Sequence, residues 1–524
     1  FEALKTEDAN GESTAIGYQA LKVQNAGASG LNVAVGYQTG LAVTTGVQNA
    51  LVGAKAGDAL TEGGQNVATG YNALNSDTLG SLSVAIGRSA LGAQNFTTAT
   101  NAFNVAVGYT AGAAVTTGIQ NTLIGSLAGD ALTDADFNVA VGHTSLGSDT
   151  LGSKSVALGG YTLANQNFTT ATDSLNVAVG HLAGNAVTTG VENVIIGALA
   201  GDSLTDADFN TAVGKAALGN EQLGSRNTAV GNSALQTQRS TTATNSYNTA
   251  FGFNAGGAVT TGVNNVLMGG LTGDALTDAD ENVAIGHAAL SSDTLGSRSV
   301  AIGREALTTQ NFTTATTTYN VAVGANAGQA VTTGTSNTLI GGLAGDAITS
   351  GASNVAVGIN SLGSNQTGNN SVAIGNGALA SQQGSNNMFN VGVGADAGAT
   401  ITTGTENTLI GSLAGDALTV GVRNVAVGKG ALGADVGGNK SVAIGHSALE
   451  HQNIASTSTD SFNTGVGYNA GSQITTGLKN TLIGSAAGDA ITDADFNVAL
   501  GVEALTTNQL GSSSTAIGTG SLAN

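Results

Sequence analysis

Asn104-Val105-Ala106-Val107-Gly108 is one copy of a short phrase, Asn/Ser-apolar-Ala/Leu-apolar-Gly, that recurs through all 524 residues of the chain. Its glycine returns at 29 successive points, nearly always about 17 residues after the previous one. Every fourth interval is longer, usually about 21 residues, so a block of about 72 residues is superimposed on the short repeat. Such fixed-period self-similarity is typical of a solenoid. The repeating glycines begin with Gly17, Gly36, Gly53, Gly70, Gly87, Gly108, Gly125 and Gly142.

The phrase has the periodicity of a β-strand. Val105 and Val107 alternate with Asn104 and Ala106, and β-branched residues favour strands. A second apolar pair, such as 90–91, and a polar turn segment follow. We therefore expect an all-β fold, a parallel β-solenoid in which each coil of about 17 residues has two short strands, with Val, Ile and Leu inside.

Two columns of identical residues are expected to run along such a stack. The repeating glycine is predicted where the backbone bends sharply or approaches the next coil. Asn104 and its equivalents are predicted to form a hydrogen-bonded column of side chains.

The periodicity continues without a proline-rich hinge or a shift in composition, since the chain contains 80 Gly and no Pro. Residues 1–524 are therefore predicted to be a single continuous solenoid shaft, with super-repeats starting near residues 32, 104, 176, 248, 320, 390 and 463. At about 4.8 Å per coil the stack would form a rod roughly 140 Å long. Both ends fall within a repeat, which suggests a segment of a longer chain.

Composition excludes several classes of function. The formal net charge of −20 disfavours binding to nucleic acid or to an anionic membrane surface. No run of 18 apolar residues is present, so this segment is not expected to insert into a membrane. Cysteine is absent, which excludes disulfides and Cys-ligated metals, and no cofactor is expected.

The residue at the centre of the phrase suggests self-association. It is Ala in three coils of each block and Leu or Ile in the fourth, as in Ala106, Leu123, Ala140 and Ala157. With only 9% charged residues, the chain has little with which to cover a free surface. We predict that these four residues and their equivalents face sister copies in a rod-shaped parallel homotrimer. The sequence separates a trimer from a dimer poorly.

Three phrases carry a family resemblance: Ser-Val-Ala-Ile-Gly-Arg-Ser-Ala-Leu at 83–91, Asn-Thr-Ala-Val-Gly-Asn-Ser-Ala-Leu at 227–235 and Ser-Val-Ala-Ile-Gly-His-Ser-Ala-Leu at 441–449. They resemble the head repeats of YadA-like trimeric autotransporter adhesins, and they are similar to repeats of marine bacteriophage tail fibres. The resemblance implies a left-handed β-roll, three copies of which pack into a trimer. The longer coil and the four-coil block depart from the adhesin pattern and favour the phage-fibre style.

These observations predict a structural protein, not an enzyme. We expect the shaft of an extracellular fibre, most simply a bacteriophage tail or virion fibre that holds a tip for host attachment. Its expected partners are its own copies and, through the tip or loops, a glycan or protein of the host cell surface. Two alternatives stay open: a bacterial trimeric autotransporter-type surface adhesin, and a polysaccharide-degrading tailspike that would use pairs of Asp residues as acid and base.

Two sets of residues are candidates for sites. Asp130, Asp134 and Asp136 lie in one polar turn and could supply oxygen ligands to Ca²⁺, although local backbone hydrogen bonds explain such aspartates more simply. The long coils carry an insertion that must bulge from the stack, with an aromatic residue at Phe96, Phe168 and Phe312. These rings are expected to fold back as staples over the coil edge, or alternatively to stack on a glycan.

Overall fold

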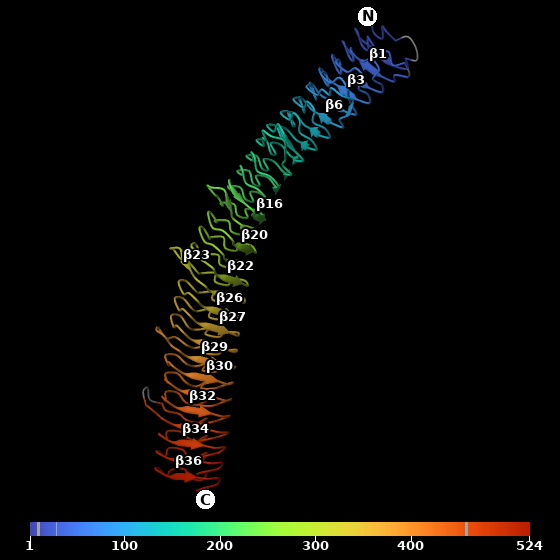
Figure 1. Cartoon of the computed structure of the whole chain (residues 1–524). Helices are drawn as coiled ribbons and strands as arrows, with labels where there is room; N and C mark the ends of the chain where they lie inside the picture. The colour runs from blue at the N-terminus through green and yellow to red at the C-terminus, as the bar shows by residue number, and fades with distance from the viewer. Residues whose placement is uncertain (8–10, 28, 456–458, 524) are drawn as a thin grey trace. The chain divides into compact units, whose positions relative to one another are not determined.

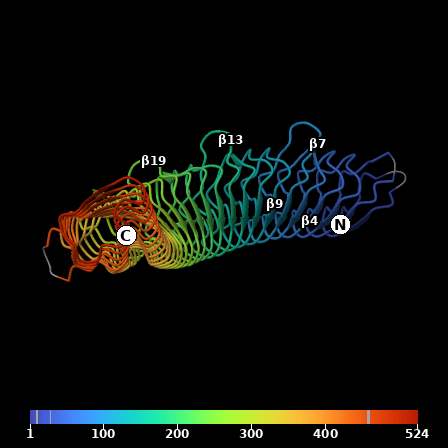
Figure 2. The same ribbon diagram turned by 90° about the horizontal axis from the view of Figure 1, so that it is seen from below.

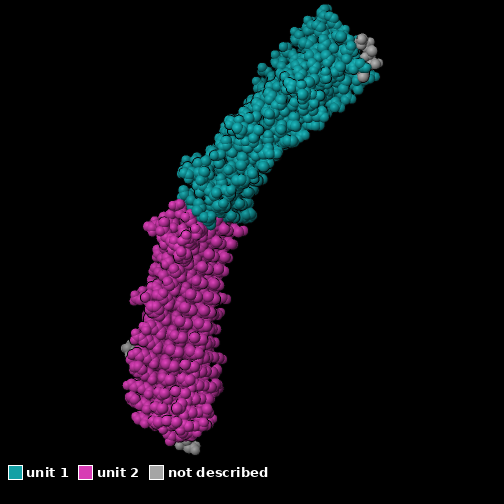
Figure 3. Space-filling model, viewed as in Figure 1, with its two compact units in different colours: residues 1–264 teal, residues 265–524 magenta. Residues whose placement is uncertain are grey.

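A computed structural model describes residues 1–7, 11–27, 29–455 and 459–523. All regular structure in these ranges is β, without any helix. The chain divides into two compact units, Phe1–Asn264 and Asn265–Asn524 (Figure 3). Each unit is a parallel β-solenoid, and the strands of both give about 29 turns of roughly 17 residues, as the repeat predicts.

In the first unit, one three-residue strand per coil pairs in parallel with the strand of the next coil, as the stacked arrows of Figure 1 show. The register aligns repeats, since Ala106 lies opposite Leu123, which lies opposite Ala140. These strands are β1 (Thr14–Ile16), β2 (Val33–Val35), β3 (Ala50–Val52), β4 (Val67–Thr69), β6 (Val84–Ile86), β8 (Val105–Val107), β9 (Thr122–Ile124), β10 (Val139–Val141), β12 (Val156–Leu158), β14 (Val177–Val179), β15 (Val194–Ile196), β16 (Thr211–Val213), β18 (Thr228–Val230) and β20 (Thr249–Phe251).

The second unit repeats the same arrangement and register. Its strands are β21 (Val266–Met268), β22 (Val283–Ile285), β24 (Val300–Ile302), β26 (Val321–Val323), β27 (Thr338–Ile340), β28 (Val355–Val357), β29 (Val372–Ile374), β30 (Val391–Val393), β31 (Thr408–Ile410), β32 (Val425–Val427), β33 (Val442–Ile444), β34 (Thr464–Val466), β35 (Thr481–Ile483), β36 (Val498–Leu500) and β37 (Thr515–Ile517).

The expected second strand is wrong for most coils. The pair at 90–91 lies in a turn, where Leu91 has a left-handed φ of 46°, a conformation that no extended strand adopts. Among the described residues, a second strand of two residues forms only beside four of the insertions. These short parallel pairs are β5 (Gly80–Ser81) with β7 (Thr100–Asn101), β11 (Gly152–Ser153) with β13 (Thr172–Asp173), β17 (Gly224–Ser225) with β19 (Thr244–Asn245), and β23 (Gly296–Ser297) with β25 (Thr316–Thr317).

The repeating glycines lie where the backbones of successive coils touch. Gly125 has a φ of +137°, in the region that favours glycine, and a Cβ on it would lie 2.4 Å from the carbonyl oxygen of Gly142 in the next coil. No other residue type therefore fits in this column without displacing the next coil.

The predicted orientation of the strand is wrong, and the inside and outside of the coil are reversed. Ala106, Leu123, Ala140 and Ala157 are fully buried within a single chain, so they cannot contact a sister copy. The flanking residues of each strand point outward instead, and Ile124 is 39% exposed.

The reason is the width of the coil. Around Gly112 the interior is already filled, because a Cβ there would lie 2.7 Å from Leu123 Cδ1 and 3.1 Å from Leu91 Cδ2. Leu91 enters from the turn, so most strands have room inside for no more than the methyl group of an alanine.

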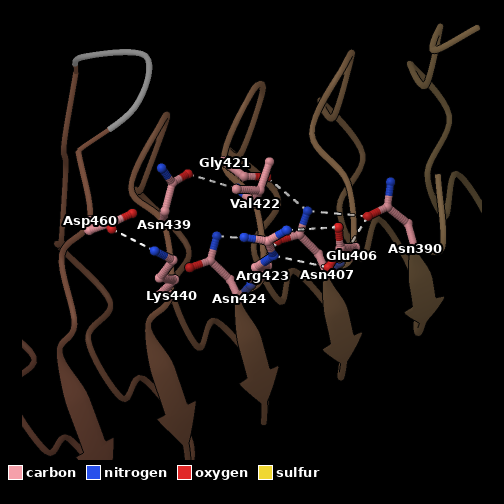
Figure 4. Close-up of polar contacts among 10 residues, drawn as sticks. All are labelled: Asn390, Glu406, Asn407, Gly421, Val422, Arg423, Asn424, Asn439, Lys440 and Asp460. Atoms are coloured by element: carbon pink, nitrogen blue, oxygen red, sulfur yellow. Dashed lines mark hydrogen bonds and ion pairs between the residues drawn. The ribbon is translucent and has the colours of Figure 1, made fainter. Parts of the chain in front are cut away.

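The predicted asparagine column is confirmed and is buried. Asn407 donates its backbone N–H to Asn390 Oδ1 (3.0 Å), and Asn424 donates its own to Asn407 Oδ1 (3.0 Å), as Figure 4 shows. Asn407 Nδ2 also donates to the carbonyl oxygen of Gly421 (2.8 Å), which ties the strand to the far side of the next coil. Each side chain thus satisfies backbone groups that would otherwise be buried without partners.

Candidate functional site

The largest candidate interaction surface is the outward strand face, which we define as the first and third residues of every three-residue strand. Val, Ile and Thr predominate there, and the parallel register stacks them into columns within each unit. Its most exposed large apolar side chains are Ile16, Val33, Val52, Ile86, Ile124, Ile196 and Phe251 in the first unit, and Met268, Ile340, Ile374, Ile410, Ile444, Ile483, Val498, Leu500 and Ile517 in the second. An exposed apolar stripe of this kind is a candidate surface for contact with another protein.

A second surface column follows the repeating glycine, where aromatic and cationic side chains stack on one another. The rings of Tyr18 and Tyr37 are stacked with centroids 5.4 Å apart. Arg88 lies over Tyr109 with its guanidinium carbon 5.6 Å from the ring centroid. His143, which follows Gly142, meets edge-on at 5.2 Å the ring of Tyr161, which lies one position beyond this column in the next coil. Because the column accepts Tyr, Arg and His alike, side-chain stacking between coils accounts for it.

The insertions form loops that extend beyond the neighbouring coils near β7 and β13 (Figure 2). A buried carboxylate holds several of these loops at the base. Asp149 Oδ1 accepts the backbone N–H of Gly152 (3.0 Å) and of Phe168 (3.1 Å), and Gln166 Nε2 donates to Asp149 Oδ2 (2.6 Å). The same three contacts recur at Asp77 and at Asp293.

Where Ser interrupts the asparagine column, the glutamine of the insertion restores the hydrogen bonding, as Gln94 shows. Ser83 replaces Asn in that coil, and Gln94 Nε2 donates to Ser83 Oγ (3.0 Å) while Gln94 Oε1 accepts from Asn104 Nδ2 (2.9 Å). The insertion is therefore integrated into the core and does not merely hang from the stack.

The aromatic rings of the insertions are not presented to solvent. Phe168 is 5% exposed, and Phe96 and Phe312 are similarly buried, so these rings act as staples and are not available to stack on a glycan. In the loop that contains Phe168, the polar residues Thr169 and Thr170 are exposed.

Burial raises the pKa of the Asp77 carboxyl, and hydrogen bonds from Gln94 and the backbone of Phe96 oppose the rise only in part. Burial likewise raises the pKa of Asp435 at the equivalent position. Both side chains are fully buried, so a bound substrate would not reach them.

The three calcium candidates do not converge. Asp136 Oδ1 accepts the backbone N–H of Ile119 (2.7 Å), whereas Asp134 accepts from the Thr117 hydroxyl. Asp130 is half-buried, and burial raises the pKa of its carboxyl, which disfavours the charged form that a cation needs. Within the ranges that the structure describes, no group of three His, Cys, Asp or Glu side chains could hold a metal ion.

One feature was missed at the level of the sequence. A polar cavity of about 410 Å³ in the first unit is lined by Ser203, Asn220, Gln222, Thr237 and Arg239. The signal was present, because several of these positions hold residues that differ from their equivalents in the preceding and following blocks.

Comparison with protein-family models and with curated proteins finds no match for this chain. None of the described segments is a helix of the length and apolar character that a membrane crossing requires. The functional proposal therefore rests on the residues and geometry of the chain itself.

Proposed function

We propose that this chain is the structural shaft of an extracellular fibre, of the bacteriophage tail or virion kind, that supports host attachment and assembles as a parallel homotrimer. The outward strand face carries the proposal. It is a regular apolar stripe on a protein with only 9% charged residues, and an identical copy presents the same stripe with the same spacing.

The outward strand face replaces the surface that the sequence predicted for the trimer. Side chains such as Ile124 and Val141 now meet those of sister chains, whereas Leu123 and Ala140 form the interior of each coil. In a cyclic trimer each chain would bury its stripe against two neighbours. Removing this β-branched surface from water stabilises the trimer by about 25 cal/mol per Å².

The regularity of the chain supports a mechanical role. The buried amide column and the stacked glycines recur coil after coil, so each coil is braced by both neighbours. The four-coil block adds one loop every fourth coil. We propose that these loops set the spacing between contacts along the shaft. No part of this role requires catalysis.

The mass of the full chain in solution tests the proposal. Sedimentation equilibrium is expected to give three times the 50.7 kDa of one chain. A stable monomer at micromolar concentration would overturn the trimer. A reducing-sugar assay on capsular polysaccharide tests the structural role separately, because steady release of sugar by this chain would make it an enzyme.

A further inference from the structure

The polar cavity of the first unit spans three consecutive coils. Ser203, Asn220 and Thr237 occupy the same position in successive coils and form one column, and Gln222 and Arg239 form a second. At the strand spacing of a solenoid this covers about 10 Å along the stack. The cavity has a volume of about 410 Å³ and is open to solvent, since Asn220, Thr237 and Arg239 are exposed.

In three related blocks of the chain a hydrogen bond between two side chains spans the equivalent position. Thr78 Oγ1 donates to Asn95 Oδ1, Thr150 Oγ1 to Asn167 Oδ1, and Thr294 Oγ1 to Asn311 Oδ1, each at 3.1 Å. Gln222 and Arg239 replace this Thr–Asn pair, and Ser240 replaces the stapling phenylalanine. The Thr–Asn hydrogen bond of those three blocks is therefore missing from this block, whose lining has its own set of side chains.

The lining departs from the repeat at two more positions. Ser203 stands where the preceding and following blocks have Ala131 and Ala275, and Asn220 stands where they have Ser148 and Ser292. These changes add hydrogen-bonding groups to the cavity wall.

The polar groups of the lining are available for a ligand. Among the residues that the structure describes, the side chains of Asn220, Gln222 and Arg239 have no hydrogen-bond or ion-pair partner. Among the described residues Glu221 forms no ion pair with Arg239, and its Oε1 accepts backbone N–H groups, including those of Gly224 (2.8 Å) and Ser240 (2.9 Å). The guanidinium of Arg239 is therefore free to pair with an anionic group from outside the chain.

This block also lacks a hydrogen bond that the related blocks of the chain contain. Gln94 Nε2 donates to Asp77 Oδ2 (2.6 Å), but the equivalent Gln238 Nε2 is buried without a partner. A buried donor without an acceptor destabilises the fold. The substitutions in this block are therefore not explained by stability.

We propose that this cavity binds an acidic saccharide, a sugar that carries a carboxylate or sulfate group. The planar guanidinium of Arg239 matches the two oxygens of such a group, and it holds them better than a point charge would. The amides of Asn220 and Gln222 and the hydroxyl of Ser203 donate to and accept from ring hydroxyls. Thr237 donates to the carbonyl oxygens of Gly257 (2.7 Å) and Val259 (3.0 Å), so its oxygen serves as an acceptor. The site goes beyond the shaft function and does not depend on trimer assembly.

Titration calorimetry on the full chain tests the site with three probes: trigalacturonate, a neutral trisaccharide of similar size, and inorganic sulfate. We expect trigalacturonate to bind one site per chain and the other two to bind at least tenfold more weakly. Arg239→Asn, which installs the residue of the related blocks, is expected to weaken trigalacturonate binding by roughly tenfold or more, because a charge-assisted pair is lost.

Two further variants keep the test decisive. Ser203→Ala with Asn220→Ser leaves the charge unchanged and is expected to weaken trigalacturonate binding as well. Arg239→Asn with Asn167→Arg restores the net charge in a block that lacks the other lining residues, and it is expected to stay as weak as Arg239→Asn alone. Circular dichroism confirms that each variant is folded.

The outcomes separate cleanly. Equal binding of sulfate would make this a simple anion site, and equal binding of the neutral sugar would remove the role of Arg239. Absence of trigalacturonate binding, or recovery of binding by Asn167→Arg, would overturn the proposal.

Discussion

Single glycines fix the distance between successive coils, and Gly125 shows how strictly. Its φ of +137° would strain the backbone of any other residue. An added Cβ would also lie 2.4 Å from Gly142 O and clash with it. We expect Gly125→Ala to destabilise the local coils by roughly 2 kcal/mol or more. Hydrogen exchange at the Gly142 amide, which donates to Ile124 O (2.7 Å), reports the loss.

Gly160→Ala is the matched control for that substitution. A Cβ on Gly160 would meet nothing nearer than His181 Cδ2 at 3.9 Å, and its φ lies outside the left-handed region. Its exchange rates are expected to match those of the unsubstituted chain. Equal effects of the two substitutions would contradict the role assigned to the glycine column.

The asparagine column makes a second prediction for single residues. Asn407→Ala leaves the backbone N–H of Asn424 and the carbonyl oxygen of Gly421 without their side-chain partner. Because both groups are buried, we expect a loss of roughly 1–3 kcal/mol for each. Thermal unfolding and hydrogen exchange at Asn424 measure it, with the exposed Asn376→Ala as control. A thermal midpoint unchanged from the control would show that water replaces the column.

Buried Asp77 makes stability depend on pH. Since its folded pKa is raised above the ordinary 3.8, its contribution to stability is fully present below about pH 3.8 and is lost as the pH rises through the folded pKa. Asp77→Asn removes this titration. Asn365, at the equivalent position, shows that an amide fits, because its Oδ1 accepts the Gly368 N–H (3.0 Å).

We therefore expect the thermal midpoint of Asp77→Asn, relative to the unsubstituted chain, to be higher at pH 7 than at pH 4. Differential scanning calorimetry across this pH range measures the difference in thermal midpoint between the two proteins. The contributions of the other titrating groups cancel in this difference. A relative midpoint that falls as the pH rises would mean that the ionised carboxylate is the better partner for the loop.

At the scale of a coil element, the insertion loop depends on its phenylalanine. Phe168 packs over Gly152, where a Cβ would lie 2.8 Å from the ring atom Cδ2. We expect Phe168→Ala to open the loop and to cost about 3 kcal/mol locally. Limited proteolysis near Thr169 detects the opening, while Phe137→Ala, at a 47% exposed ring, leaves cleavage unchanged. Equal cleavage of both variants would show that the aspartate alone holds the loop.

The coil also shows what a sequence can and cannot predict. Alternation in 104–108 correctly grouped Val105 with Val107 and Asn104 with Ala106, because the period of a strand is fixed. Which group lies inside depends on the space that the turns leave, and Leu91 fills that space from a left-handed turn. The rule that larger apolar residues are buried therefore failed here.

The polar cavity was not predicted from the sequence, for a different reason. The repeat draws attention to what every block shares, whereas Ser203, Asn220 and Arg239 matter because they differ from the other blocks. Whether such differences converge on one cavity depends on the register between coils, which only the structure supplies.

For the whole molecule, the decisive property is whether the outward strand face is covered by sister chains. Ile124, Val141 and Leu158 are the third residues of β9, β10 and β12, which pair in succession. Substituting Lys at all three therefore introduces three charges into one stretch of the stripe. If the stripe is a trimer interface, burial of these charges is prohibitive and the assembly dissociates. We expect sedimentation to show 50.7 kDa monomers, with the circular dichroism of the solenoid retained.

Lys at the exposed Gln120, Ser148 and Thr169 adds the same charge elsewhere and is expected to leave the trimer intact. A trimer that survives the first set of substitutions would show that another surface holds the chains together.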